Sequence, residues 1–231
     1  MTPQELQTWR RILRHELIAK RATLPRPTFE EYRRRIDTHL QRAFPDLVHG
    51  VIAFCWPYKN EYDARHLLAA LRRRGAITAL PSVVRPKTPL VFREWHPGVR
   101  LEPGPLGIPF PPDGPPVQPD SVLLPLVAFD AGGYRLGYGG GYFDRTLAAI
   151  AHRPRVIAVA YEFQFIETIY PQPHDIPMDY VVTERGIYVR RSQGGLRFLA
   201  DTAQGYSSPP CYAAEIAPDY FGEFPPPKPR L

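Results

Sequence analysis

The sequence predicts an α/β fold built on a mostly parallel sheet that carries helices on both faces. From residue 50 onward, short apolar segments typical of buried strands alternate with amphipathic segments of helical period. The chain also has 231 residues, of which 44% are hydrophobic and 12% aromatic, enough for one α/β domain with a sizeable core. Strands that alternate with helices favour parallel pairing, because each helical crossover returns the chain to the same edge of the sheet.

The first 43 residues are predicted to form two basic helices, arranged as an N-terminal helical hairpin. An apolar stripe with steps of three and four runs through residues 3–22 and consists of Leu6, Trp9, Leu13 and Leu17. Two prolines end that pattern, and residues 28–31 (Thr-Phe-Glu-Glu) then match a capping box that begins a second helix ending near Ala43. Basic residues outnumber acidic ones in this region, and charge alone favours a solvated surface.

The remaining elements are expected in the order in which strand and helix patterns follow one another. Strands are predicted over residues 51–56, 77–84, 90–95, 121–130, 155–161, 180–183 and 187–189, and helices over residues 63–74 and 142–151. The proline-rich residues 101–120 are expected to cross irregularly. We expect one domain over residues 1–190, followed by a proline-rich C-terminal tail, 191–231, that has no core of its own.

The composition narrows the class of function. A net charge of +6 suits an anionic partner, whether a nucleotide, a polyanionic substrate or a nucleic acid. No apolar run approaches the ~20 residues of a membrane span, and the N-terminus lacks the layout of a signal peptide. Two cysteines are too few for a disulfide framework or a cysteine-rich zinc site. We therefore expect a cytoplasmic protein with no membrane partner.

The densest motif is the glycine-rich loop of residues 132–141, which lies between an apolar strand and a helix. Glycines let backbone amides approach a phosphate closely, and the following helix offers its positive end. Arg135 adds a positive charge, and Asp144 is a candidate ligand for Mg²⁺. The loop matches neither the Walker A nor the dinucleotide-binding pattern. A tight turn without a ligand therefore remains an alternative.

A second cluster occupies the proline-rich residues 171–179. Asp175 and Asp179 are candidate carboxylate ligands of a metal, and His174 beside them is a candidate general base. One histidine and two aspartates do not match a zinc spacing, so Mg²⁺ shared with a nucleotide is the more plausible ion. Aspartates in such a segment also form turns, which is the structural alternative.

The third cluster, residues 56–63, follows a predicted buried strand. Trp56 and Tyr58 are suited to stacking on a flat heterocycle, and Glu61 is suited to accepting hydrogen bonds from ring N–H groups. The structural alternative is that Asp63 caps the next helix while Trp56 packs in the core.

Together, the three clusters resemble the 5-formyltetrahydrofolate cyclo-ligase family, also called methenyltetrahydrofolate synthetase, over about residues 8–190. The most specific part is Val127-Ala128-Phe129-Asp130 followed by the segment from Arg135 to Arg145. The segments similar to the family's ATP-binding, folate-binding and closing segments are residues 10–14, 61–63 and 174–175.

The resemblance implies both a fold and a reaction. The fold is a three-layer α/β/α sandwich related to ribose-5-phosphate isomerase and CoA-transferase folds. The reaction uses Mg²⁺, with ATP as co-substrate, to convert 5-formyltetrahydrofolate to 5,10-methenyltetrahydrofolate, ADP and phosphate. Phosphorylation of the formyl oxygen, attack by N10 and loss of phosphate need positioning and charge neutralisation more than a protein nucleophile. The partners would be a reduced folate and ATP, and the protein a monomer or homodimer.

The resemblance also assigns residues. The ATP-binding residues it implies are Arg10, Arg11, Arg14, Arg135, Leu136, Gly137, Tyr138, Gly139, Gly140, Gly141, Tyr142 and Phe143. The substrate-binding residues it implies are Trp56, Glu61, Tyr138 and Tyr142. Asp144 would hold Mg²⁺, and we add Asp175 as a second carboxylate on the metal side, with Asp179 as the alternative.

Three positions depart from the family pattern. Arg10 stands where the family usually has lysine, so a planar fork replaces a point charge. Ala64 stands where many members have threonine. The stretch 107–112, which contains Phe110, replaces an acidic or amide residue before proline, so one substrate contact is expected to differ.

Two other functions are compatible with parts of the sequence. A non-catalytic folate- or nucleic-acid-binding protein would keep the fold without turnover. Nucleic-acid binding would interleave basic and aromatic residues along one surface, whereas the N-terminal arginines form a compact cluster. A sugar-phosphate isomerase on the same fold would not need ATP.

Overall fold

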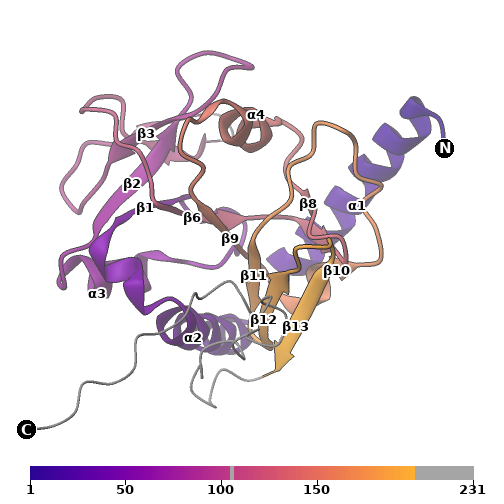
Figure 1. Cartoon of the computed structure of the whole chain (residues 1–231), viewed down its shortest axis with the longest axis horizontal. Helices are drawn as coiled ribbons and strands as arrows, with labels where there is room; N and C mark the ends of the chain where they lie inside the picture. The colour runs from indigo at the N-terminus through magenta and orange to yellow at the C-terminus, as the bar shows by residue number, and fades with distance from the viewer. Residues whose placement is uncertain (105–106, 201–231) are drawn as a thin grey trace, which may run out of the picture.

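The computed structural model describes residues 1–104 and 107–200, and an eight-stranded sheet crosses its centre (Figure 1). The strand order is β13-β12-β11-β9-β6-β1-β2-β3. These strands are β1 (Val51–Phe54), β2 (Ile77–Ser82), β3 (Val91–Glu94), β6 (Ser121–Pro125), β9 (Arg155–Val159), β11 (Tyr180–Thr183), β12 (Gly186–Arg190) and β13 (Leu196–Ala200). The five strands from β11 to β2 pair in parallel, and the strands beyond them pair antiparallel, so the predicted mostly parallel sheet is confirmed.

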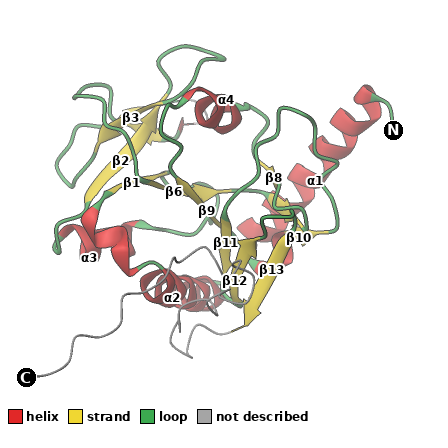
Figure 2. Ribbon diagram, viewed as in Figure 1, coloured by secondary structure: helices red, strands yellow, loops and turns green. Residues whose placement is uncertain are grey.

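Helices pack against both faces of this sheet (Figure 2). Helices α2 (Arg26–Ala43) and α3 (Arg65–Arg72) cover one face, and α4 (Tyr142–Ala149) covers the other. Alternate residues of β1 face opposite sides, as the pleat of a strand requires. Ile52 and Phe54 belong to the core cluster that contains Leu40 of α2, whereas Ala53 belongs to the cluster that contains Leu147 of α4. The core therefore has two layers, separated by the sheet.

Helix α1 (Pro3–Ala22) has the bounds that the apolar stripe predicts, and a capping box between Thr2 and Glu5 begins it. Its Leu13 and Leu17 pack beside a second, three-stranded sheet rather than on the large one. Helix α2 begins at Arg26, with Pro25 as its N-cap, and Pro27 lies in the first turn, where the missing N–H costs no intrahelical hydrogen bond. The capping box predicted at residues 28–31 is therefore wrong. Helix α2 packs on β11 and β12, and the predicted hairpin with α1 is not confirmed.

The segment predicted as one strand over residues 121–130 is divided in two. Strand β6 ends at Pro125, and β7 (Ala128–Asp130) joins β8 (Arg135–Leu136) and β10 (Phe165–Ile166) in the three-stranded sheet. The break is stable because its carbonyls are satisfied: the buried Gln164 amide donates to the carbonyls of Leu126 and Val127, both at 2.9 Å. This division places residues 128–130 and 135–136 in the three-stranded sheet rather than in the large one.

The proline-rich crossing contains two short strands, β4 (Glu102–Pro103) and β5 (Pro109–Phe110), and the rest of its described residues are irregular, as predicted. Strand β13 extends the large sheet beyond residue 190, where we expected the domain to end. The remainder of the predicted tail, residues 201–231, lies outside the described residues. Among the helices that are described, none is long and apolar enough to cross a membrane.

Candidate active site

A cavity of about 470 Å³ opens where the parallel strands end. Trp56 lies just beyond β1, while Pro81 of β2 and Pro125 of β6 complete this edge of the cavity. The carboxyl ends of parallel strands meet at one edge of a sheet, which is where α/β proteins bind ligands. The cavity therefore lies where the strand order places a ligand.

The structure brings most of the predicted site residues to this cavity. Those that border it are Arg10, Arg14, Trp56, Glu61, Arg135, Leu136, Gly137, Tyr138, Gly139, Gly140, Gly141, Tyr142, Phe143, Asp144 and Asp175. Arg11 is exposed and does not border it, because it projects from α1 at a different angle from Arg10 and Arg14. Asp179 and Tyr58 also lie outside the cavity lining, and Ala64 is buried in the core at the start of α3.

The second half of the glycine-rich loop, residues 137–141, connects β8 to α4 beside the cavity. Gly139 and Gly141 have φ angles of 94° and 61°, in the left-handed region that favours glycine. A Cβ atom on Gly141 would lie 2.9 Å from Nη1 of Arg145, whose guanidinium also donates to the carbonyl of Gly140. This packing brings the N-terminus of α4 to the cavity, and a helix N-terminus attracts anions.

An ion pair closes the base of the loop. Arg135, whose side chain is 5% exposed, donates to Asp144 Oδ1 at 2.7 Å and to the carbonyl of Ile176 at 2.6 Å. The same Asp144 oxygen accepts the Ile176 N–H at 3.1 Å. Burial lowers the pKa of Arg135, and the charge of Asp144 opposes that shift. Asp144 is therefore a constrained carboxylate rather than an exposed loop side chain.

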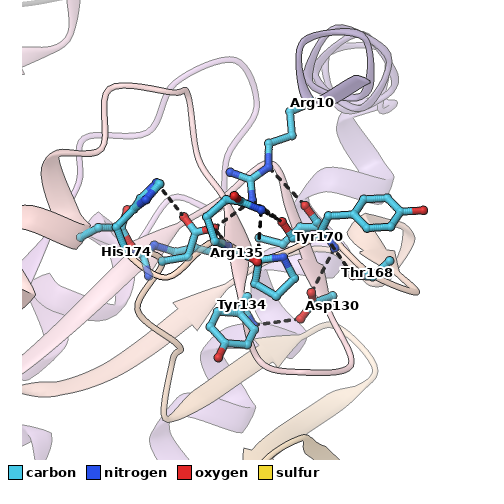
Figure 3. Close-up of polar contacts among 12 residues, drawn as sticks. Arg10, Asp130, Tyr134, Arg135, Thr168, Tyr170 and His174 are labelled. Atoms are coloured by element: carbon cyan, nitrogen blue, oxygen red, sulfur yellow. Dashed lines mark hydrogen bonds and ion pairs between the residues drawn. The ribbon is translucent and has the colours of Figure 1, made fainter. Parts of the chain in front are cut away.

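The two bordering arginines of α1 differ in how their donors are used. Arg10 reaches from α1 to the segment around Tyr170, where it donates to the carbonyls of Ile169 and Tyr170 and to Asp175 (Figure 3). Arg14 donates through Nε to the carbonyl of Gly137 at 2.7 Å. Its terminal amino groups make no hydrogen bond within residues 1–104 and 107–200, and they lie against Gly139. Arg14 thus offers free donors at the glycine-rich loop.

The acidic candidates of the second cluster are separated by the fold. Asp175 borders the cavity and pairs with Arg10 at 2.8 Å. Asp179 instead pairs with Arg153 at 3.0 Å and accepts the Val156 N–H at the start of β9. Of the two carboxylates left open by the sequence, Asp175 is the one at the cavity. His174 borders the cavity with a largely exposed side chain.

Glu61, in the turn after β1, is a buried carboxylate that borders the cavity. Its Oε1 accepts the Tyr138 hydroxyl at 2.6 Å and lies 3.4 Å from Arg21, and its Oε2 accepts the Tyr58 N–H at 3.0 Å. Burial raises the pKa of Glu61, whereas the Arg21 charge and the Tyr138 hydrogen bond lower it. Every oxygen of this carboxylate is therefore already in use.

An apolar wall completes the cavity. Trp56 packs edge-on against Trp95, at 5.8 Å between ring centroids, and carries the Arg65 guanidinium on its face. Phe110, from the stretch that departs from the family pattern, also borders the cavity. Cys55 lies beside Trp56, and desolvation raises the pKa of its thiol, which disfavours the reactive thiolate.

Sequence reasoning missed Arg21, the buried partner of Glu61. Arg21 is 1% exposed and also contacts the Tyr138 hydroxyl at 2.5 Å. A signal was present, because Arg21 continues the apolar stripe of α1, four residues beyond Leu17. A charge on the buried stripe of a helix indicates a specific partner.

The residues present allow a cation only together with a ligand. Within residues 1–104 and 107–200, no group of three or more His, Cys, Asp or Glu side chains is arranged to hold a metal ion. Mg²⁺ is commonly bound by one or two carboxylates and by phosphate oxygens of the substrate. Asp144 and Asp175, both at the cavity, fit that second arrangement.

Fold and site define the class of protein: an α/β enzyme whose cavity combines arginines and a helix N-terminus, the groups that bind phosphate, with an apolar wall suited to a heterocycle. The model of the 5-formyltetrahydrofolate cyclo-ligase family matches residues 6–184. The chain belongs to this family, as its three motifs predicted.

Individual relatives agree with this assignment. A 5-formyltetrahydrofolate cyclo-ligase of Mycolicibacterium smegmatis is 39% identical over 135 residues, which cover 57% of this chain and 66% of that protein. The Escherichia coli K12 protein of the same name is 32% identical over 167 residues, 69% of this chain and 91% of its own length. The solved structure of Aquifex aeolicus 5,10-methenyltetrahydrofolate synthetase has a TM-score of 0.67 and 30% identity, covering 84% of this chain and 98% of that one.

Proposed function

We propose that this chain converts 5-formyltetrahydrofolate to 5,10-methenyltetrahydrofolate, with ATP as co-substrate and ADP and phosphate as the other products. The observation that carries the proposal is the composition of one cavity in a member of the cyclo-ligase family. Arg14 and the glycine-rich loop lie on one side of that cavity, and Trp56 and Phe110 on its apolar wall. The first set suits a polyphosphate and the second a pterin ring.

On the nucleotide side, Arg14 and the segment from Arg135 to Phe143 bind ATP. Arg14 supplies the free amino groups, and the loop supplies backbone N–H groups and the N-terminus of α4. Arg10 contributes through its charge and by holding Asp175 in place. The exposed Arg11 has no direct contact in this proposal, in contrast to what the resemblance implies.

The metal-side residues are Asp144 and Asp175. When bound, Mg²⁺ would neutralise charge on the phosphate oxygens of ATP. Arg135 holds Asp144 and Arg10 holds Asp175, so each carboxylate has a fixed position before a ligand arrives. A positioned carboxylate loses less conformational entropy on binding than a mobile one.

On the folate side, Trp56, Glu61, Tyr138 and Tyr142 contact or orient the substrate. Phosphorylation transfers the γ-phosphoryl group of ATP to the formyl oxygen and releases ADP. N10 then attacks the formyl carbon and loses its proton, and the C–O bond to phosphate breaks. The chain's residues align these groups and stabilise charge, which is sufficient for such a displacement without a protein nucleophile.

The test is the absorbance of 5-formyltetrahydrofolate mixed with the enzyme, with and without ATP and Mg²⁺. We expect the methenyl chromophore to grow only when both are present. A folded protein that forms no chromophore, but binds the folate, would overturn the proposal in favour of the non-catalytic alternative, which the family relatives do not favour. Chromophore growth without ATP would exclude the proposed phosphorylation.

We also propose the finer architecture implied by the family. The two core layers on either side of the sheet support a three-layer α/β/α sandwich related to ribose-5-phosphate isomerase and CoA-transferase folds. The enzyme domain spans residues 1–190, with β13 added to its edge from the C-terminal side.

A further inference from the structure

Arg21 is a buried cation that serves two elements of the site at once. Its side chain leaves the last turn of α1, which ends at Ala22, and does not border the cavity. Nη2 contacts the Tyr138 hydroxyl at 2.5 Å and Glu61 Oε1 at 3.4 Å. Tyr138 belongs to the glycine-rich loop, whereas Glu61 belongs to the turn after β1. One guanidinium therefore contacts two segments that border the cavity.

The hydrogen bonds of this group run in one direction. Arg21 donates to the oxygen of Tyr138, and Tyr138 donates its own proton to Glu61 Oε1 at 2.6 Å. Hydrogen bonds in such a chain polarise one another, and charge at both ends strengthens them. The orientation of the Tyr138 hydroxyl is thus set by Arg21 on one side and by Glu61 on the other.

Arg21 also holds the turn that carries Glu61. Its Nε donates to the carbonyl of Lys59 at 2.9 Å, and its Nη2 lies 3.3 Å from the carbonyl of Tyr58. Lys59 and Asn60 have φ angles of 48° and 57°, a conformation that non-glycine residues rarely adopt. Such a turn persists only where surrounding contacts hold it. The guanidinium supplies two of those contacts.

The remaining nitrogen fixes Arg21 to the sheet. Nη1 donates to the carbonyl of Leu126 at 3.0 Å, at the break between β6 and β7. All three nitrogens of the guanidinium are therefore engaged, in a planar fork that a lysine ammonium cannot reproduce. The partners come from the turn after β1, the glycine-rich loop and the residue that follows β6.

We propose that Arg21 is a positioning residue of the reaction, which acts through Tyr138 and Glu61 to hold the nucleotide side and the folate side of the cavity in one arrangement. This proposal rests on the proposed function. This positioning role differs from a purely structural one in its effect on binding. Loss of the Arg21 guanidinium displaces Tyr138 and Glu61 together, and this displacement weakens the binding of both substrates.

The test compares Arg21→Lys with Arg33→Met in steady-state kinetics and in thermal unfolding. Arg33 is the matched control, because it is a half-buried arginine paired with Glu30 and Asp37 on α2, away from the cavity. We expect Arg21→Lys to raise the KM for ATP and for 5-formyltetrahydrofolate by about tenfold each, the scale of one charged hydrogen bond. Arg33→Met should lower the melting temperature and leave both KM values unchanged. Wild-type KM values in Arg21→Lys, or equal KM changes in both variants, would overturn the proposal.

A second variant tests the same hydrogen bonds without changing Arg21, and it also stands alone if Arg21→Lys does not fold. Tyr138→Phe keeps the ring and removes only the central hydroxyl of the chain. We expect both KM values to rise. The double variant with Arg21→Lys should raise them little beyond either single change, because both substitutions break the same series of hydrogen bonds. Unchanged KM values in Tyr138→Phe, or fully additive effects, would contradict the proposed role.

Calorimetric titration with ADP and Mg²⁺ separates this proposal from the proposed function. If the wild-type enzyme forms no methenyl chromophore, the proposed reaction fails whatever Arg21 does. Arg21→Lys should still bind ADP about tenfold more weakly than wild type, if the fork orders the glycine-rich loop. Equal ADP affinity in the two proteins would overturn the role of Arg21 alone.

Discussion

Arg10 and Asp175 lie 165 residues apart in the chain, yet their side chains meet at 2.8 Å beside the cavity. The resemblance assigned the arginine to ATP, and we added the aspartate as a second carboxylate on the metal side. In the structure they neutralise each other, and Arg10 also holds the backbone carbonyls of Ile169 and Tyr170. The pair therefore attaches α1 to the segment that presents Asp175 to the cavity.

Arg10→Lys tests this attachment, and lysine is the residue that the family usually has at this position. An ammonium can reach Asp175 but cannot also donate along the fork to both carbonyls. We expect the free energy of unfolding, measured in urea, to fall by about 1–2 kcal/mol, the value of one or two net hydrogen bonds. A double-mutant cycle with Asp175→Asn should show coupling between the two side chains. Additive effects of the two changes would contradict the attachment.

Arg14→Gln should weaken ATP binding, whereas Arg11→Gln should not. Arg14 has free terminal amino groups against Gly139, and the exposed Arg11 projects away from the cavity. Because a hydrogen bond to a charged group is worth ~1.5–3 kcal/mol, we expect the KM for ATP to rise by at least about tenfold in Arg14→Gln. Arg11→Gln is the matched control for net charge. Equal KM changes in the two variants would indicate a general electrostatic effect.

The sequence predicted the elements well where the signal is local. The stripe over residues 3–22 has the bounds of α1, and the short apolar segments became strands of the large sheet. The division at Leu126 was not predictable from pattern, because a side chain 38 residues away, Gln164, satisfies the carbonyls of the break. Prediction of strand 121–130 as one unit followed from its continuous apolar character, which both halves retain.

The site residues also include some that local motifs predict and others that depend on distant segments. Motifs drew attention to the glycine-rich loop, Asp144 and Asp175, and the structure places all three at the cavity. The resemblance implied ATP contacts for Arg11 together with Arg10 and Arg14, but adjacent positions on a helix point in different directions, and Arg11 does not border the cavity. Arg21 was missed because its partners come from three other segments, which only the tertiary fold brings together.

Asp144→Asn should abolish turnover and also reduce stability. The amide keeps the shape of the side chain but lacks the charge that a magnesium ligand needs. It also leaves the buried Arg135 without its counter-charge, so we expect a lower melting temperature, in contrast to the small effect expected for an exposed loop carboxylate. Turnover is measured by methenyl absorbance over a range of Mg²⁺ concentrations. Wild-type turnover in this variant would exclude a role for Asp144 in metal binding.

The Asp46–Arg155 pair should make the free energy of unfolding depend on pH. The hydrogen bond from Arg155, 2.7 Å long, lowers the pKa of Asp46 in the folded state. The pair therefore contributes stability above the unfolded pKa of about 3.9, and this contribution is lost as the pH falls through the lower folded-state value. Because the Asp46 side chain is 60% exposed, solvent screening limits the effect to about 0.5 kcal/mol. The free energies of unfolding of Asp46→Asn and of the wild type, measured in urea, should differ at pH 7 and become equal in strong acid. A difference that does not change with pH would contradict this account.

Phe110→Ala should weaken folate binding selectively. Phe110 borders the apolar part of the cavity and packs over Gly104, where an added Cβ would lie 2.9 Å from the ring. Removing the ring takes apolar surface from the wall, and a buried aromatic side chain is worth ~1.5–3 kcal/mol. We expect the KM for 5-formyltetrahydrofolate to rise about tenfold while the KM for ATP stays unchanged, since the glycine-rich loop is untouched. Val84→Ala, an exposed apolar truncation outside the cavity, serves as the control. Equal changes in both KM values would show that Phe110 supports the cavity as a whole rather than the folate.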